Sequence, residues 1–245
     1  MQHTVRPLVL PGSRASLLAL AAFVLVAGCG PASQPATGVA GDAYFPMVAG
    51  ARWLYSLRSD LGRLEVEVTA RGEMPLPGAG GAVFVMDERN LGPDLGFAET
   101  APVGYVVEEG YVARIAGLGY DASGHLRLLG QDQPTRILPL EPTPGHRWGQ
   151  ETQLFRTPDG GGARLGWTGE VKTLTPLSVP AGRFEEVVEL ETLYRDASQG
   201  EIAVNVIYRD YYARGVGLVR SVTEDPSGDP AHRIEQVLLE YDFPR

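Results

Sequence analysis

The feature that most constrains the fold of this chain is an alternation of apolar and polar residues with a period of two. Leu64, Val66 and Val68 alternate with glutamates, and the same period recurs along most of the chain that follows. Successive side chains of a β-strand point to opposite faces, so the pattern predicts strands with one buried face. The predicted strands number about eleven. They include Leu64–Val68, Ala82–Met86, Tyr105–Val107, Tyr111–Ile115, Leu126–Leu129, Ala163–Thr173, Glu185–Tyr194, Ile202–Tyr208, Val216–Thr223 and Ile234–Tyr241.

Turns rich in Gly and Pro separate these strands, and the chain after residue 29 contains no convincing amphipathic helix. Many antiparallel strands joined by such turns form either a sandwich or a curved sheet. We predict an all-β fold, a curved antiparallel sheet or partly closed half-barrel. A hydrophobic fraction of 44% supports a core, and a single cysteine excludes an internal disulfide, so packing must stabilise the fold.

Three glycine-containing segments predict local geometry. The sequence Glu108-Glu109-Gly110 between two strands predicts a hairpin, and Gly182 predicts a sharp turn into the strand that follows it. Gly215 and Gly217 flank a valine inside a strand pattern. This predicts a bulge, a tight bend that curves the sheet, or a place where another group approaches the backbone.

The sequence Gly-x-Arg-Trp occurs twice, at residues 50–53 and 145–148. Each copy follows a Pro-containing apolar approach, and each predicts a turn that delivers a strand whose tryptophan fills the core. The region 44–245 is predicted to be a single antiparallel domain. It divides either into two similar halves, 44–137 and 138–245, or into no true repeat if the two copies arose by coincidence.

The first 28 residues have the features of a secretory signal: arginines, an apolar stretch and small residues before Cys29. The apolar stretch is shorter than the roughly 20 residues that a transmembrane helix needs. Val26-Ala27-Gly28-Cys29 resembles the bacterial lipobox, in which the cysteine receives the lipid. The alternative is an ordinary cleaved signal that leaves Cys29 as a free thiol. Lipidation would place the protein in the cell envelope, held to the membrane by its acyl chains.

Residues 29–43 are rich in Pro, Gly, Ala, Ser and Thr and predict a flexible tether. Position 30 is Gly rather than the Asp that retains enteric lipoproteins in the inner membrane, which favours the outer membrane if the organism has one. The formal net charge is −9, and loss of Arg6 and Arg14 with the signal makes it −9 − 2 = −11. Such an acidic body argues against binding to nucleic acid or to anionic lipid head groups.

The sequence offers no catalytic or metal-binding motif. His125, His146 and His232 stand far apart, no cysteine pair exists, and Gly-x-Ser-x-Gly is absent. Adjacent carboxylates on a strand point to opposite faces and do not form a dyad. We therefore predict no catalytic residue, no metal and no cofactor.

Aromatic residues are the strongest functional signal. We predict that a concave sheet face carries a ligand or partner surface, because apolar concavities with a few polar groups are the usual small-molecule sites. The candidate residues are Trp53, Tyr55, Trp148, Trp167, Tyr211 and Tyr212. Ordinary core packing is the alternative. Tyr211 and Tyr212 must point to opposite faces, so one of them is expected to face solvent or a partner.

Three stretches carry a family resemblance: residues 44–55 (Tyr-Phe-Pro to Trp-Leu-Tyr), residues 179–187 (Val-Pro-Ala-Gly-Arg-Phe) and residues 211–219 (Tyr-Tyr-Ala-Arg-Gly-Val-Gly-Leu-Val). They resemble a loose group of uncharacterised bacterial exported proteins and lipoproteins, similar to the antiparallel half-barrel of lipoprotein carriers. The resemblance implies a fold and an envelope location, and it brings no catalytic residues. The carriers usually have a helix across the open face of the sheet.

These observations favour a non-enzymatic envelope lipoprotein that binds an apolar ligand or an envelope protein through its curved sheet. Two alternatives stay open. One is an interaction module with a filled core and no pocket. The other is an envelope hydrolase acting on glycan or ester substrates, which would need paired carboxylates in a cleft or a nucleophile bonded to a histidine.

Overall fold

The structure is a computed structural model that describes residues 43–60, 62–76, 81–91, 100–115, 118–121, 123–128, 134–156, 162–196, 203–229 and 232–244. The predicted signal peptide, Cys29 and nearly all of the predicted tether lie outside these residues. The strands are β1 (Arg52–Ser59), β2 (Gly62–Leu76), β3 (Gly81–Asn90), β4 (Thr100–Glu108), β5 (Tyr111–Ile115), β6 (Leu118–Tyr120), β7 (Leu126–Leu128), β8 (Thr135–Pro139), β9 (Arg147–Arg156), β10 (Gly162–Val179), β11 (Gly182–Asp196), β12 (Ala203–Ala213), β13 (Gly217–Glu224) and β14 (Ile234–Asp242).

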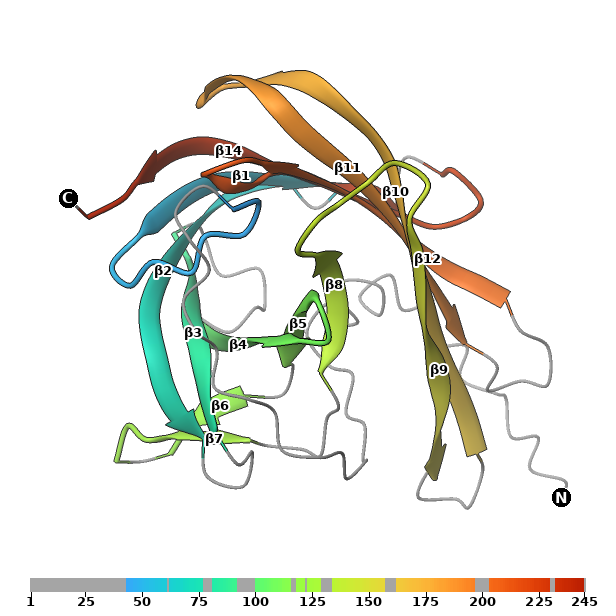
Figure 1. The fold of residues 1–245 in the computed structure, drawn as a ribbon, viewed down its shortest axis with the longest axis horizontal. Coiled ribbons are helices and arrows are strands. Elements are labelled where there is room, and N and C mark those ends of the chain that lie inside the picture. The colour runs from blue at the N-terminus through green and yellow to red at the C-terminus, as the bar shows by residue number, and fades with distance from the viewer. Residues whose placement is uncertain are drawn as a thin grey trace, which may run out of the picture.

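Twelve of these strands form one antiparallel sheet in the order β8-β5-β4-β3-β2-β1-β14-β13-β12-β11-β10-β9, and β6 pairs only with β7. The sheet curls around an interior without closing (Figure 1). The predicted all-β half-barrel is confirmed, and the sandwich is excluded. The described part of the chain contains no helix long and apolar enough to cross a membrane.

The strand order repeats within the sheet. The series β1-β2-β3-β4-β5-β8 and the series β9-β10-β11-β12-β13-β14 each follow the chain from neighbour to neighbour. The ladder between β1 and β14 joins the two series, with Trp53 opposite Tyr241. The sheet is therefore continuous across the β1–β14 pair, and β8 and β9 are its two edges.

The two Gly-x-Arg-Trp segments adopt the same backbone geometry. Gly50 and Gly145 have φ angles of 83° and 84°, a left-handed conformation that favours glycine. The amide of Gly50 donates to the Ala70 carbonyl and that of Gly145 to the Val171 carbonyl, both at 2.8 Å. The predicted turns are confirmed, and the tryptophan that follows each turn is buried. A division at residues 137 and 138 stays a prediction.

The interior of the half-barrel contains the main core, which includes Tyr44, Phe45 and Met47 from the segment before β1. Phe45 packs against Tyr105 of β4 at 4.7 Å between ring centroids and against Tyr212 of β12 at 6.3 Å. The backbone carbonyl of Ala43 accepts a hydrogen bond from the Gly215 amide. An extended segment, rather than a helix, therefore lies between the two walls of the sheet.

A second, smaller core lies on the outer face, where the β6–β7 hairpin covers β3, β4 and β5. Gly104 is needed there, because a Cβ at this position would lie 2.7 Å from Leu118. Asp87 is the buried acidic residue of this face, and it accepts hydrogen bonds from Arg71 at 2.6 Å and from Tyr120 at 2.7 Å. The carboxylate of Asp87 thus joins the hairpin to the sheet.

Two of the three predictions made from glycine-containing segments are confirmed, and one is wrong. Glu109 and Gly110 form the β4–β5 hairpin turn with positive φ angles, and Gly182 opens β11 after a two-residue turn, both as predicted. The predicted bulge at Gly215 and Gly217 is wrong. Residues 214–216 form the turn between β12 and β13, and Ala213 pairs with Gly217 across it. The glycines supply the left-handed angles of a hairpin, not a bend within one strand.

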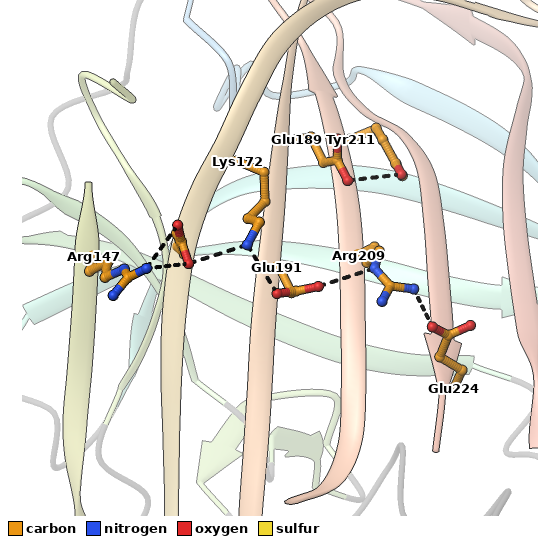
Figure 2. A network of polar contacts seen from close by, with 8 residues as sticks. Arg147, Lys172, Glu189, Glu191, Arg209, Tyr211 and Glu224 are labelled. Carbon is orange, nitrogen blue, oxygen red and sulfur yellow. Dashed lines mark hydrogen bonds and ion pairs between the residues drawn. The ribbon is translucent and has the colours of Figure 1, made fainter. Parts of the chain in front are cut away.

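The outer face of the second series carries a ladder of alternating charges (Figure 2). From β9 to β13 it contains Arg147, Glu170, Lys172, Glu191, Arg209 and Glu224, each paired with the next. Each exposed pair contributes at most about 1 kcal/mol, but opposite charges on adjacent strands also favour one register. The ladder makes this face strongly polar.

The packing of Trp148 on Gly169 gives a first prediction. A Cβ at Gly169 would lie 2.1 Å from the indole ring, so Gly169→Ala must displace Trp148. We expect a loss of about 1–3 kcal/mol in the free energy of unfolding, measured by urea denaturation. Gly149→Ala is the matched control, since its nearest side chain lies at 3.5 Å. Equal effects of the two substitutions would contradict the proposed packing.

Candidate functional site

A group of polar side chains lies on the inner face of the half-barrel, where strand alternation would otherwise place apolar residues. Tyr208 and Asp210 share the inward face of β12 with Tyr212. Arg114 lies two residues after the inward-facing Val112 on β5, so it is on the same face as Val112. We define the polar cluster as Glu88, Arg114, Tyr208, Asp210 and Ser221. It draws on β3, β5, β12 and β13, so the curvature of the sheet brings its members together.

Arg114 is the positive charge of the polar cluster. It lies opposite Tyr105 in the β4–β5 ladder. Burial by itself lowers the pKa of the guanidinium, but Tyr105 and Glu88 outweigh burial, so the pKa lies above its ordinary value and Arg114 stays charged. The Nε atom is buried and has no hydrogen-bond partner in the described part of the chain. A buried donor without a partner is rare and needs an explanation.

Asp210 is the titrating acid of the polar cluster. Its Oδ1 accepts a hydrogen bond of 2.5 Å from the Ser221 hydroxyl. Burial raises the pKa of Asp210 to about 6, although Ser221 and Arg114 oppose that shift. Asp210 and Arg114 lie deep within the molecule, yet both keep part of their surface accessible to solvent. Neither side chain is therefore completely enclosed by the core.

Buried tyrosines separate the polar cluster from the rest of the core. Burial raises the pKa values of Tyr55, Tyr105 and Tyr212 above their ordinary range, and Glu88 or Asp210 adds to the shift in each case. The Tyr55 hydroxyl donates to the Leu218 carbonyl at 2.9 Å. All three residues thus stay neutral, and the rings of Tyr105 and Tyr212 pack against Phe45.

Trp167 supplies a second buried donor without a partner. It lies on β10 opposite Tyr194, two residues from Gly169, and its side chain is only partly buried. Its Nε1 atom has no hydrogen-bond partner among the described residues. On the next strand pair, Thr192 of β11 lies opposite Tyr208 of β12. Because Tyr208 belongs to the polar cluster, the β11–β12 ladder connects the wall that carries Trp167 to that cluster.

Side chains join the two edges of the sheet at one end. The Trp148 indole donates to the Arg136 carbonyl at 3.1 Å, from β9 to β8. The Tyr111 hydroxyl and His146 Nε2 lie 2.9 Å apart, and the rings of Tyr111, His146 and Trp148 contact one another. These contacts narrow the opening between β8 and β9 without forming a ladder.

The predicted aromatic residues divide between the two faces. Trp53, Tyr55 and Tyr212 are packed into the core, Trp148 lies at the edge contact, and Trp167 lies on the inner wall. Tyr211 lies on the outer face, where it contacts Glu189 and Arg220. The opposite orientation of Tyr211 and Tyr212 is as predicted. A role of these six residues in binding stays a prediction.

Sequence reasoning missed Arg114, Asp210 and Ser221. One signal was available, because Asp210 lies between Tyr208 and Tyr212 at a position that alternation assigns to the buried face. A polar residue at such a position is informative. The proximity of Arg114 carried no signal, since it comes from a strand almost 100 residues away.

The three histidines have separate partners. His125 lies 3.6 Å from Asp121, His232 pairs with Asp225, and His146 contacts Tyr111. Ser227 also bonds to Asp225, in an exposed turn. No cluster of three or more potential metal ligands occurs among the described residues.

Comparisons with known proteins find two similar solved structures. One is a Bacteroides fragilis protein described as exported and of YmcC-like fold, with 12% identity and a TM-score of 0.46. The other is a Parabacteroides distasonis protein described as a lipoprotein, with 14% identity and a TM-score of 0.44. Each alignment covers 82% of this chain and 99% of the other. No protein-family model and no curated protein matches the sequence.

The raised pKa of Asp210 gives a second prediction. Folded Asp210 holds its proton up to about pH 6, whereas the ordinary value is 3.8. The stability that the bound proton gives is therefore fully present below the ordinary value and is lost as the pH rises through about 6. Asn resembles the protonated acid and can still accept the Ser221 hydrogen bond. Asp210→Asn should thus be more stable than wild type at neutral pH, by up to about 3 kcal/mol.

The measurement is urea denaturation of both proteins across that pH range. The gain from Asp210→Asn should grow as the pH rises. Asp60→Asn, in an exposed turn, is the matched control and should show no such trend. A pH-independent difference between Asp210→Asn and wild type would contradict the assignment.

Proposed function

We propose that this protein is a cell-envelope lipoprotein, anchored through lipid on Cys29, whose half-barrel binds an apolar ligand on its inner face. The lipobox-like sequence, the signal features before it and the tether after it support the anchor. The lipid would supply the membrane attraction, since the acidic body does not favour anionic head groups.

The observation that carries the ligand proposal is the chemistry of the inner wall. Trp53 and Trp148 belong to the core that the sheet encloses, and two buried donors, Arg114 Nε and Trp167 Nε1, have no hydrogen-bond partner among the described residues. An apolar wall with a few unpaired polar groups is typical of small-molecule sites. The outer face, in contrast, carries the charge ladder and the β6–β7 hairpin.

A protein partner is the second candidate. Among the described residues, β8 and β9 each have a ladder partner on one side only, and a free edge can pair with a strand of another protein. This candidate gains support if the inner face takes no small molecule.

The anchor gives a third prediction, tested by growing cells with a fatty-acid probe. The wild-type protein should incorporate label and fractionate with membranes, because Cys29 is the only thiol in the chain. Cys29→Ser should lose both properties. Equal labelling of the two proteins would contradict lipidation at Cys29.

The ligand site gives a fourth prediction, tested on the chain from Gly30 onward, which retains every described residue. A long-chain fatty acid carrying bromine should quench tryptophan fluorescence, because bromine quenches an indole only at close range. Trp167→Phe should remove most of the quenching, since Trp53 and Trp148 are only 4% and 6% exposed. A flat titration with wild-type protein would contradict ligand binding and favour the protein partner.

A further inference from the structure

We propose that the polar cluster binds the anionic head group of a single-chain amphiphile, with Arg114 as the residue that holds its oxygen atoms. The shared chemistry is that of a carboxylate or a phosphate. This inference rests on the proposed function and specifies the ligand that the inner face accepts.

The strongest support is the unmet hydrogen-bonding capacity of Arg114. A guanidinium has five N–H donors in a planar fork that matches carboxylate and phosphate oxygens. Its Nε has no partner in the described chain, and the ion pairs found among the described residues do not include Arg114. A buried charge is costly unless it is paired, so the site is poised for an acceptor with negative charge.

The two nearby acids do not fill that role. Asp210 is already bonded to Ser221, and burial makes it hold its proton more tightly than an ordinary aspartate. Glu88 acts on Arg114 through space, on the inward face of β3. When Asp210 is protonated, it adds no negative charge beside Arg114, and the acid becomes a donor that can itself bond to an anion.

The surroundings of Asp210 leave it as the group that titrates near neutral pH. Its neighbours are Ser221 on β13, Arg114 on β5, Tyr105 on β4, and Tyr208 and Tyr212 on its own strand. Burial holds the pKa values of these tyrosines above their ordinary range, so they stay neutral. Loss of the Asp210 proton adds a negative charge beside Arg114 and should weaken binding of an anion.

The inner wall next to the polar cluster suits a hydrocarbon chain. Tyr208 and Trp167 are partly accessible aromatic side chains, and Thr192 lies on β11, the strand between theirs. The Trp167 indole N–H offers a further donor to a polar group of the ligand. The site thus combines a charged end with an apolar surface, as an amphiphile requires.

The test is calorimetric titration of the chain from Gly30 onward with four compounds that share one alkyl chain: dodecanoate, dodecyl phosphate, dodecanol and dodecylamine, each below its micelle concentration. We expect one or both anions to bind at least about tenfold more tightly than the alcohol, and the amine to bind most weakly. If only one anion binds tightly, that result identifies the head group.

Arg114→Gln should remove this preference, so that the variant binds the two anions no more tightly than dodecanol. Arg136→Gln is the matched control, because Arg136 lies on the neighbouring strand β8 and pairs with Glu109. If Arg114→Gln does not fold, Asp210→Asn carries the test. This variant should bind dodecanesulfonate, whose charge does not change with pH, equally at about pH 5 and about pH 7.5, whereas wild type should bind it more tightly at the lower pH.

The outcomes separate the two proposals. Equal binding of the anions and dodecanol by wild type, or tighter binding of the amine, would overturn the head-group inference while the ligand-binding function stands. Binding of none of the four compounds would overturn the proposed function itself. Loss of anion preference in Arg136→Gln as well as Arg114→Gln would also overturn the role of Arg114.

Discussion

The half-barrel depends on the burial of its N-terminal segment between two walls of one sheet. Phe45 contacts Tyr105 on one side and Tyr212 on the other, so a single ring spans the interior between β4 and β12. A twisted sheet of twelve strands needs such a filling, because an empty interior would lose dispersion contacts along both walls. The segment around Phe45 therefore sets the distance between the two walls, β4 on one side and β12 on the other.

That separation gives the interior two chemically different regions. Around Phe45, Trp53 and Leu238 the core consists of buried apolar side chains. In the polar cluster, Arg114 and Asp210 influence each other electrostatically from strands that are distant in sequence. A protein selected only for stability would fill this region with apolar side chains, since a buried charge without a close partner destabilises the fold. The retention of these groups is the reason to assign them a role in binding.

Much of the fold was predictable from the sequence, because alternation and turn residues are local signals. The hairpin at Gly110, the turn at Gly182 and both Gly-x-Arg-Trp turns follow from a few neighbouring residues. The strands β6 and β8 were missed, since three and five residues are too short to show a period. Most of the polar cluster could not be predicted from the sequence. The alternating pattern marks Asp210 as inward-facing, but only the curvature of the sheet shows that Arg114 shares its space.

The ladder between β1 and β14 has a kinetic consequence. It pairs Arg52 with Asp242, so the two ends of the body must meet before the sheet is complete. Folds dominated by such distant contacts form slowly, and their incomplete intermediates expose strand edges. A partly synthesised polypeptide that lacks β14 cannot form the complete sheet, so it cannot reach the final fold before its synthesis ends. Slow completion of this kind prolongs the time for which the chain stays incompletely folded.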